Sequence, residues 1–488
     1  MDGITPNVLF KSPKDKVATV QGEVGAVRSS VESPNSAGAK GPYLNKRDSV
    51  KEDEVIGPCE GLIMPNKVQE LQRTLYRKAK AEPRWRAWSL YGHVCRRDVL
   101  EAALNAVVKN KGAAGFDGIC TDSVKAGKEA FLNSLQEKLM DRSYKPGPVL
   151  RTWIPKADGK QRPLGIPNVV DRIVQMALLL VLNPIFEADF DEGSYGYRPG
   201  RKAVDAVDAI REELRHGRTE LIDADLSGYF DTIDHTKLLK LVAKRVSDGS
   251  ILRLIKLFLK APIVERKNGK VSYHTNDRGT PQGGVLSPLL ANLYLNDLDH
   301  GVNDKPELDA KIIRYADDFV LITRPGKAAG LLERLKKYLE AKKLKLNETK
   351  TRLVKFREES FNFLGFNYSW RRSGTTLRYY VHVEPSQKAT LKLRDKIRAE
   401  LSHWTKFLSC SEVVERVNRI TRGWCNFYDY GNCNATFRQQ QTWLRNRLRR
   451  WLWRKYDCTH ALFEFFTDQR LTGQYNLWSF PTTVPWRR

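Results

Sequence analysis

The chain has 488 residues, of which 41% are hydrophobic and 10% aromatic, so it can form real hydrophobic cores in two or three domains. Its 83 Lys and Arg residues against 57 Asp and Glu residues give a formal net charge of +26. Charge of this sign concentrates polyanions at the surface, and we expect nucleic acid because each neutralised phosphate releases counterions. General disorder is excluded, and a membrane-surface role is disfavoured because no long basic helix has a clean apolar face.

Seven cysteines are scattered along the chain without any C-x-x-C pair, which argues against a disulfide framework and against a zinc ribbon or HNH-type zinc site. The longest apolar run, residues 176–182, is too short to span a bilayer. The N-terminus lacks the apolar core of a signal peptide. We therefore expect a protein of a reducing cytoplasm with no membrane segment.

The first part of the chain predicts a leader followed by helices. Residues 1–65 are rich in Ser, Gly, Pro, Lys and Glu and predict poor order. Apolar residues recur at helical spacings over residues 68–107, until three glycines within residues 110–118 interrupt the helix. A further helix is predicted over residues 123–140. Residues 151–164 then carry an Asp-Gly pair between two extended runs, which predicts a hairpin with a basic tip.

The central part mixes helices and strands. Residues 169–182 predict a mostly buried helix that Asn183 and Pro184 stop. Residues 220–226 predict a strand, and Asp234 can cap the helix that follows it.

Residues 279–284 predict a loop, and the Ser-Pro pair after it predicts the start of a helix over residues 287–299. Residues 311–323 have two apolar arms around an acidic centre, which predicts a hairpin. Residues 330–344 predict an amphipathic helix. From Pro385 on, the chain predicts basic, tryptophan-rich helices. Strands mixed irregularly with helices, and then helices alone, favour an α+β domain followed by an all-α domain.

Two adjacent aspartates, Asp317 and Asp318, occupy the centre of the predicted hairpin. Asp225 lies near the end of the strand over residues 220–226, and Asp223 falls on the same face of that strand, so the pattern leaves both as candidates. Clustered carboxylates repel one another, and Mg²⁺ prefers oxygen ligands of this kind. Two such ions about 4 Å apart can activate a hydroxyl and neutralise a leaving pyrophosphate. An isolated Asp-Asp pair is often a solvated turn, but the apolar arms favour a buried site.

Several motifs then resemble those of reverse transcriptases, and of the group II intron branch in particular. Tyr315-Ala-Asp-Asp318 is similar to their Y-x-D-D signature. The segment from Asp225 to Asp231 resembles their first acidic motif, which selects Asp225 over Asp223. The remaining similar segments are the Pro-Gln-Gly motif at 278–288, three group II intron motifs at 154–167, 195–199 and 363–366, and a maturase-like motif at 423–428.

The resemblance implies a role for each matching residue. Asp225, Asp317 and Asp318 would be the catalytic residues and, with the backbone carbonyl of Leu226, the ligands of two Mg²⁺ ions. Five side chains would bind the incoming deoxynucleotide: Lys156, Arg162, Phe230, Gln282 and Lys350. Phe230 would lie under the sugar and exclude a 2′-hydroxyl, Gln282 would lie against the nascent base pair, and Lys350 would assist as an acid. Without the resemblance, Phe230 is better explained as a core aromatic than as a nucleotide contact. Lys156 and Arg162 are explained equally well as solvated residues of a basic turn, and Lys350 is better explained as a surface lysine.

Basic residues and tryptophans alternate from Lys388 to Arg454. Arginines can clamp phosphates while rings stack or pack, and we expect the tryptophans in a helix-bundle core. The resemblance implies a thumb with an RNA-binding surface, to which we assign Arg445, Arg447, Arg449 and Arg450. Many relatives also carry a C-terminal HNH endonuclease with paired cysteines. Here 30 residues follow Cys458 and no cysteine pairs occur, so we expect a form that lacks this endonuclease.

The expected fold is therefore a right-hand polymerase of the α+β class, with an antiparallel palm sheet, followed by an all-α thumb/maturase domain. The expected ranges are a leader (1–65), a helical extension of the fingers (66–134), the reverse transcriptase domain (135–366), the thumb/maturase domain (384–465) and a tail (466–488).

The resemblance implies an RNA-directed DNA polymerase that also binds its group II intron RNA and assists splicing and retromobility in the bacterial cytoplasm. Its partners would be the intron RNA, an RNA template with a DNA primer, deoxynucleoside triphosphates and a DNA target, whereas the oligomeric state stays open. The alternatives are a splicing cofactor with an unused polymerase site, or a domesticated cellular reverse transcriptase in defence or repair.

Overall fold

The structure is a computed structural model that describes residues 64–155, 159, 161–267, 270–459 and 461–482. Residues 1–63 of the predicted leader lie outside these ranges. The N-terminal part is helical, which confirms the prediction from its periodicity. Its helices are α1 (Asn66–Ala81), α2 (Tyr91–Val94), α3 (Arg97–Lys109), α4 (Thr121–Ala126) and α5 (Lys128–Met140). Gly127 separates α4 from α5, so the one helix predicted over 123–140 is two.

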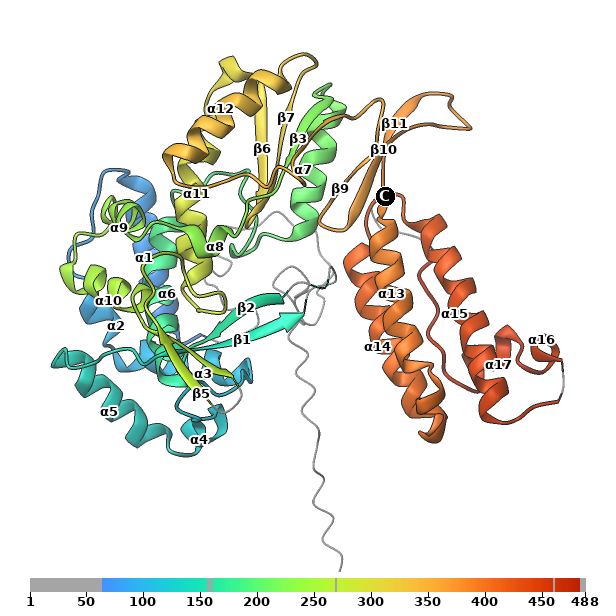
Figure 1. Cartoon of the computed structure of the whole chain (residues 1–488), viewed down its shortest axis with the longest axis horizontal. Coiled ribbons are helices and arrows are strands. Elements are labelled where there is room, and N and C mark those ends of the chain that lie inside the picture. Colours follow the sequence, from blue (N-terminus) through green and yellow to red (C-terminus); the bar gives the residue numbers. More distant parts are fainter. Residues whose placement is uncertain (1–63, 156–158, 160, 268–269, 460, 483–488) are drawn as a thin grey trace, which may run out of the picture. The chain divides into compact units, whose positions relative to one another are not determined.

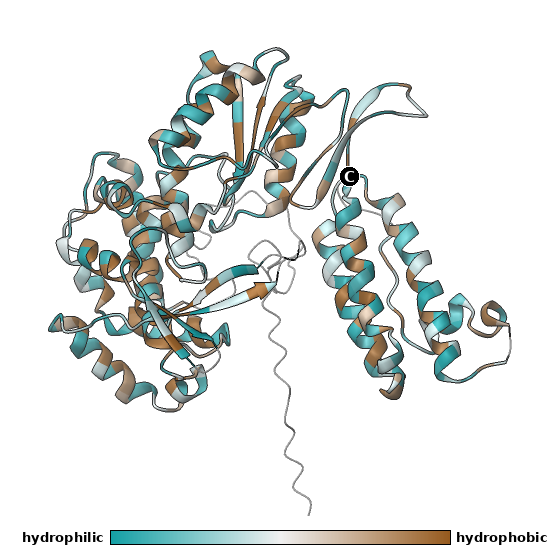
Figure 2. Cartoon of the chain, viewed as in Figure 1, coloured by the Kyte–Doolittle hydropathy of each residue, from teal (hydrophilic) through white to brown (hydrophobic). Residues whose placement is uncertain are grey.

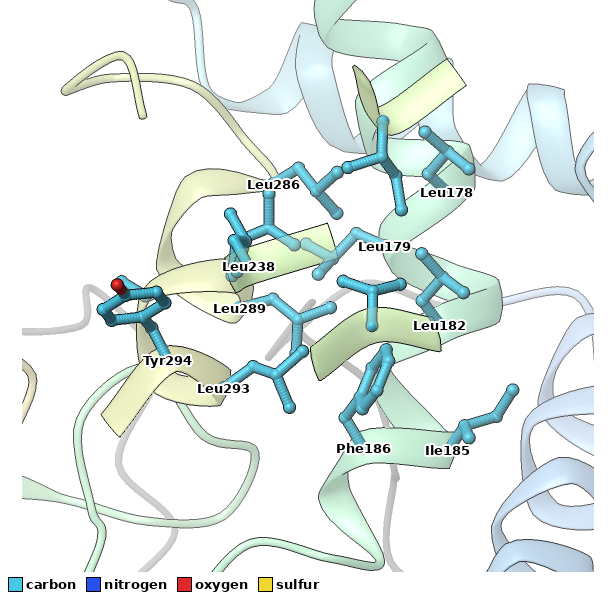
Figure 3. Close-up of a cluster of buried hydrophobic side chains, with 14 of the residues drawn as sticks. Leu178, Leu179, Leu182, Ile185, Phe186, Leu238, Leu286, Leu289, Leu293 and Tyr294 are labelled. Atoms are coloured by element: carbon cyan, nitrogen blue, oxygen red, sulfur yellow. The ribbon is translucent and has the colours of Figure 1, made fainter. Parts of the chain in front are cut away.

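Helix α6 (Val169–Glu187) is the centre of the largest hydrophobic core. Nearly all of its residues are buried, and α1, α3 and α11 (Ser287–Asn303) pack against it. Figure 3 shows Leu182 and Phe186 of α6 facing Leu293 of α11. The predicted stop at Pro184 is wrong, because this proline lies inside the helix. An internal proline costs about 3 kcal/mol or more, but burial of each large apolar side chain around it contributes about 1.5–3 kcal/mol.

Among the described residues, α6 is also the one helix long and apolar enough to cross a membrane. However, 94% of its most apolar window is buried inside the protein, which is the setting of a core helix.

Four strands form a fingers sheet in the order β2-β1-β4-β5. β1 (Val149–Pro155) and β2 (Gln161–Ile166) pair antiparallel and confirm the predicted hairpin. β4 (Ile263–Lys267) pairs with β1 in parallel, and β5 (Lys270–His274) is an exposed edge strand. Helices α9 (His235–Ala243) and α10 (Gly249–Leu259) precede β4. The predicted cap of α9 is confirmed, because the Asp234 side chain accepts a hydrogen bond from the amide of Lys237 at 3.0 Å.

A second sheet, the palm sheet, is antiparallel throughout and has the order β6-β7-β3-β8. Its strands are β3 (Glu220–Ala224), β6 (Ala310–Tyr315), β7 (Asp318–Thr323) and β8 (Arg352–Lys355), with the short α8 (Tyr229–Thr232) after β3 and η1 (Pro306–Leu308) before β6. Period two sends alternate side chains into different cores. Ile312 and Leu321 join the core that contains α11 and α12 (Ala328–Ala341), whereas Ile313 and Val320 join the core that contains α7 (Ala203–Arg215). Figure 1 shows α12 and α7 on opposite sides of these strands.

The C-terminal part begins with three antiparallel strands, β9 (Phe361–Phe363), β10 (Phe366–Arg372) and β11 (Tyr379–Pro385). The helices that follow are α13 (Gln387–Glu400), η2 (His403–Phe407), α14 (Cys410–Tyr428), α15 (Asn434–Lys455), α16 (Leu462–Phe465) and α17 (Asp468–Gly473). They share a core of their own that includes Leu393, Val417 and Leu444. Figure 2 shows hydrophobic residues on part of each long helix and hydrophilic residues on the rest. The predicted class, α+β followed by all-α, is confirmed.

Candidate active site

The three aspartates predicted as catalytic lie at one end of the palm sheet. Asp318 is the first residue of β7, Asp317 precedes it in the β6–β7 turn, and Asp225 directly follows β3. β3 and β7 are antiparallel, and their last rung pairs Ala224 with Phe319. The next residue along is Asp225 after β3 and Asp318 at the start of β7, and the charge of Asp225 raises the pKa of Asp318. The fold therefore makes neighbours of side chains that are distant in the sequence.

The buried side chain of Arg314 holds the β6–β7 turn. Ala316 in this turn has a φ of +62°, a left-handed conformation that costs a non-glycine residue about 1 kcal/mol or more. The guanidinium of Arg314 donates to the carbonyl oxygen of Ala316 at 2.9 Å. It also forms a fully buried ion pair with Asp299 and donates to the side-chain oxygens of Asn292 and Ser194, each at 2.8 Å. This network fixes the backbone that carries the acidic pair.

The segment from Tyr195 to Tyr197 covers the same turn from another side. A Cβ on Gly196 would lie 2.3 Å from the amide nitrogen of Ala316, so glycine allows this close approach. Tyr197 has a φ of +59° and is 36% exposed. Burial raises the pKa of Tyr197, and the charge of Asp317 raises it further. Tyr197 therefore lies beside the acidic pair, although no role was predicted for it from the sequence.

Each carboxylate of the site is under the electrostatic influence of the others. Burial raises the pKa of Asp317, and the nearby charge of Asp225 adds to the rise. Burial also raises the pKa of Asp318 to about 7, with further increases from Asp317 and Asp225 and a decrease from Lys350. Like charges held together without a cation have this effect, and a bound divalent cation would reverse it.

Asp225 is oriented by the segment that follows α12. Its carboxylate accepts a hydrogen bond from Nδ2 of Asn347 at 2.9 Å and lies 3.3 Å from Nζ of Lys350. The amide of Asn347 also donates to the backbone carbonyl of Asp225 at 2.8 Å. Asp223, the alternative that the strand period left open, instead pairs with Arg352 at 3.3 Å. These contacts favour Asp225 as the third carboxylate and bring Lys350 to the site.

Gln282, in the Pro-Gln-Gly loop, is held between two groups. Its Oε1 accepts a hydrogen bond from Nε of Arg162 at 2.7 Å, and its Nε2 donates to Asp231 at 3.2 Å. Gly283 has a φ of +112°, and a Cβ there would lie 2.4 Å from the carbonyl oxygen of Gly165 in β2. The loop therefore packs directly on the fingers hairpin and brings together two side chains predicted to bind the nucleotide.

Three other residues were predicted for the site, and the structure describes the surroundings of two of them. Phe230 is 8% exposed, and its ring packs edge-on against Tyr229 with centroids 5.5 Å apart. Leu226 forms an antiparallel bridge with Leu346 beside Asp225. Lys156 lies outside the described residues. The roles of all three in catalysis stay predictions.

The four arginines predicted to bind RNA occupy different environments on α15. Arg449 is buried and pairs with Asp468, and Arg445 donates to the same carboxylate at 2.7 Å. Arg450 is exposed and Arg447 is half-buried. Within the part of the chain that the structure describes, neither has a carboxylate within salt-bridge distance. All four assignments stay predictions, but Arg445 and Arg449 have a structural use in joining α15 to α17.

A different group of possible metal ligands consists of Asp191, His300 and Asp304, whose ligand atoms lie within 4.8 Å of one another. Both ring nitrogens of His300 are already used: Nδ1 contacts Asp304 at 2.7 Å, and Nε2 contacts the carbonyl oxygen of Asp189 at 2.8 Å. Since the imidazole has no free nitrogen for a metal, this group is a weaker candidate than the three aspartates.

Comparisons with known proteins agree with this arrangement. Residues 154–368 match the family model described as reverse transcriptase (RNA-dependent DNA polymerase), and residues 390–463 match the group II intron, maturase-specific domain. The first match contains β2 of the fingers hairpin and the three aspartates, and the second contains α14 and α15. A domain of the first kind is a metal-dependent nucleotidyltransferase that acts on nucleic acid, whereas one of the second kind acts on intron RNA.

Relatives are similar over most of the chain. Protein YkfC of Escherichia coli (strain K12) is 33% identical over 362 residues, 66% of this chain and 93% of YkfC. The group II intron-encoded protein LtrA of Lactococcus lactis subsp. cremoris is 31% identical over 425 residues, 70% of either chain. The uncharacterized 91 kDa protein in cob intron of Schizosaccharomyces pombe is 25% identical over 415 residues, 70% of this chain and 50% of that protein. With both domains present in this order, the chain belongs to the family of group II intron reverse transcriptase/maturases, which are RNA-directed DNA polymerases.

Proposed function

We propose that this chain extends a DNA primer along an RNA template with deoxynucleoside triphosphates, and that Asp225, Asp317 and Asp318 hold two Mg²⁺ ions for the reaction. The observation that carries this proposal is the meeting of three carboxylates at one end of the palm sheet, where the pKa values of Asp317 and Asp318 are raised. With the backbone carbonyl of Leu226 they would form an all-oxygen donor set, which suits Mg²⁺. Ions bound there would activate the primer 3′-hydroxyl and neutralise the leaving pyrophosphate.

Residues of the fingers and of the Pro-Gln-Gly loop would bind the incoming nucleotide. Arg162 would contact the triphosphate together with Lys156, because its guanidinium has five N–H donors and the bond to Gln282 uses Nε. Gln282, held from both sides, would lie against the nascent base pair. Phe230 would lie under the sugar, where its ring leaves no room for a 2′-hydroxyl.

Lys350 would assist the departure of pyrophosphate. Its ammonium lies 3.3 Å from Asp225, so a triphosphate bound at the carboxylates would lie within its reach. There it would donate a proton to the leaving pyrophosphate as a general acid.

The C-terminal helices would bind the intron RNA, assist its splicing and support retromobility into a DNA target. The support is the match of residues 390–463 to the maturase-specific domain, together with the net charge of +26. We propose that this takes place in the bacterial cytoplasm, because the described cysteines are free thiols, which suits a reducing compartment.

Primer extension on an RNA template, together with splicing of a group II intron RNA in the presence of the chain, tests both parts. Asp317→Ala should abolish DNA synthesis and leave splicing assistance largely intact, whereas the exposed Glu359→Ala should leave both unchanged. Primer extension by Asp317→Ala at the wild-type rate would refute the assignment of the site. A wild-type chain that assists splicing but extends no primer would instead support a cofactor with an unused polymerase site.

A further inference from the structure

Arginines of α13 and α15 gather on one surface. On α15, Arg447, Arg450 and Arg454 follow one another at the spacings i, i+3 and i+7, which place them on one face of the helix. α13 packs against α15 and contributes Arg398. Burial lowers the pKa of Arg447, and repulsion from the other three arginines lowers it further. The other three guanidiniums are therefore close enough to repel that of Arg447.

Little negative charge balances this cluster within the protein. Arg398 pairs with Asp395 at 2.6 Å. In the described ranges, no carboxylate lies within salt-bridge distance of Arg447, Arg450 or Arg454, and the buried Nε of Arg447 has no hydrogen-bond partner. Like charges held together reduce the stability of the folded chain. A polyanion that supplied phosphate oxygens would remove this cost and satisfy the unused donors.

Two exposed aromatic rings lie next to the cluster on η2. Trp404 is 82% exposed and Phe407 is 78% exposed. Two hydrogen bonds hold the chain just before η2 against α15. Arg447 donates to the carbonyl oxygen of Leu401 at 3.4 Å, and the indole of Trp451 donates to the carbonyl oxygen of Ser402 at 3.1 Å. Single exposed rings such as Trp88 are ordinary, but these two rings lie three residues apart on a 3₁₀ helix, hence on one side of it, and beside a cationic cluster.

We propose that this arginine–tryptophan surface binds a segment of the intron RNA in which an unpaired base interrupts a helix. The surface consists of Arg398 of α13, Arg447, Arg450 and Arg454 of α15, and Trp404 and Phe407 of η2; Figure 1 labels α13 and α15. The arginines contact the phosphates, and a ring of η2 stacks on the unpaired base. RNA is favoured over a protein partner because the patch combines concentrated positive charge with stacking platforms, which is how proteins bind unstacked RNA bases. The inference rests on the proposed binding of intron RNA and adds the RNA feature that is recognised.

Two RNA hairpins that differ in one bulged nucleotide test the stacking part, with the full-length chain and fluorescence anisotropy. The wild-type chain should bind the bulged hairpin more tightly. Trp404→Ala should lower that affinity roughly 5- to 150-fold, as expected for the loss of one stacked base, and leave the affinity for the paired hairpin unchanged. Trp404→Phe should restore most of the affinity. The control Trp88→Ala removes a ring that is 77% exposed elsewhere and should change nothing.

Salt dependence tests the phosphate contacts. A variant with the three arginines of the α15 face changed to glutamine should reduce the slope of log affinity against log salt by roughly 2 to 3, since each phosphate contact contributes about 0.7 to 0.9. The matched control removes three exposed cations of α12: Arg334, Lys336 and Lys337. Its slope should stay at the wild-type value.

Each outcome separates the inference from the proposed function. The inference is wrong if the wild-type chain binds both hairpins equally tightly. It is also wrong if the test and control variants lose the same RNA affinity. Either result leaves the proposed binding of intron RNA in place. A wild-type chain that binds neither hairpin nor the intron RNA overturns both. If Trp404→Ala dissociates a dimer in light scattering and leaves RNA affinity unchanged, the surface is an interface between copies and the inference is wrong. Because the Trp404 ring is exposed, its removal should leave the unfolding temperature at the wild-type value.

Discussion

Replacing Asp318 with asparagine should stabilise the metal-free protein while it abolishes DNA synthesis. The pKa of this carboxyl is raised from 3.8 to about 7, first by burial and then by the charges of Asp317 and Asp225. Between about pH 4 and pH 7, Asp318 therefore keeps its proton in the folded state, whereas the same side chain in the unfolded chain has already lost it. Stability must fall as the pH rises through this window, and above pH 7 the full cost is present. Asparagine has nearly the same shape and carries no charge, so it removes the cost.

The size of the effect follows from the shift. About three pH units at about 1.4 kcal/mol each give an upper bound of about 4 kcal/mol. Asp318 is only half-buried, so water screens part of this interaction, and we expect about 1–2 kcal/mol. For a domain of this size, that corresponds to an unfolding temperature higher by roughly 2–8 °C.

Thermal unfolding with EDTA, at pH 8 and at pH 4.5, measures the difference. Asp318→Asn should unfold at a higher temperature than the wild type at pH 8, and the gap should nearly close at pH 4.5. The control Glu359→Gln, at an exposed carboxylate, should show no gap at either pH. A variant that is less stable than the wild type at pH 8, or a gap that does not change with pH, would refute the reasoning.

Three further substitutions test other parts of the site. Arg314→Met leaves Asp299 buried without its partner and should cost about 3–5 kcal/mol in chemical denaturation, with DNA synthesis lost; wild-type stability would contradict the role of this ion pair. Gly283→Ala places a Cβ about 2.4 Å from the carbonyl oxygen of Gly165 in a left-handed conformation, and should lower the rate of primer extension at least tenfold without unfolding the chain. Phe230→Ala should raise ribonucleotide incorporation relative to deoxynucleotides in a competition assay, and an unchanged ratio would show that this ring does not exclude the 2′-hydroxyl.

The parts of the fold that local patterns encode were predicted well. The apolar arms around Asp317 and Asp318 predict a hairpin, and the same alternation splits its side chains between two cores in the structure. The Asp-Gly pair predicts the fingers hairpin, and Asp234 predicts a helix start. In each case, the motif and the hairpin or helix that it predicts lie within about ten residues of each other in the sequence.

Features that depend on distant partners could not be predicted in this way. The end of α6 depends on the other helices that pack against it, since Pro184 is buried inside this helix. The environment of Arg449 depends on Asp468, which lies beyond the end of α15. The same limit applies to the tryptophans: Trp451 is 4% exposed, as a core position predicts, whereas Trp404 is open to water.

Arg314 is the functional residue that the sequence reasoning missed most clearly. It is a charged residue inside an apolar strand arm, directly before Tyr315, and such a charge must find a buried partner when both faces of the sheet are covered. That conflict was a usable signal. However, the sequence could not identify Asp299 as the partner, because the pairing depends on how α11 packs on β6.

The most direct test of the metal site is iron-mediated cleavage of the chain. With Fe²⁺ in place of Mg²⁺ and with added hydrogen peroxide and ascorbate, the bound Fe²⁺ reduces peroxide to hydroxide and a hydroxyl radical, which cuts the nearest backbone, and mass spectrometry locates the cuts. Cleavage is expected next to Asp225 and next to Asp317 in the wild-type chain, and it should disappear in Asp317→Ala. Cleavage only around His300, or a pattern that Asp317→Ala leaves unchanged, would contradict a metal centre formed by the three palm carboxylates.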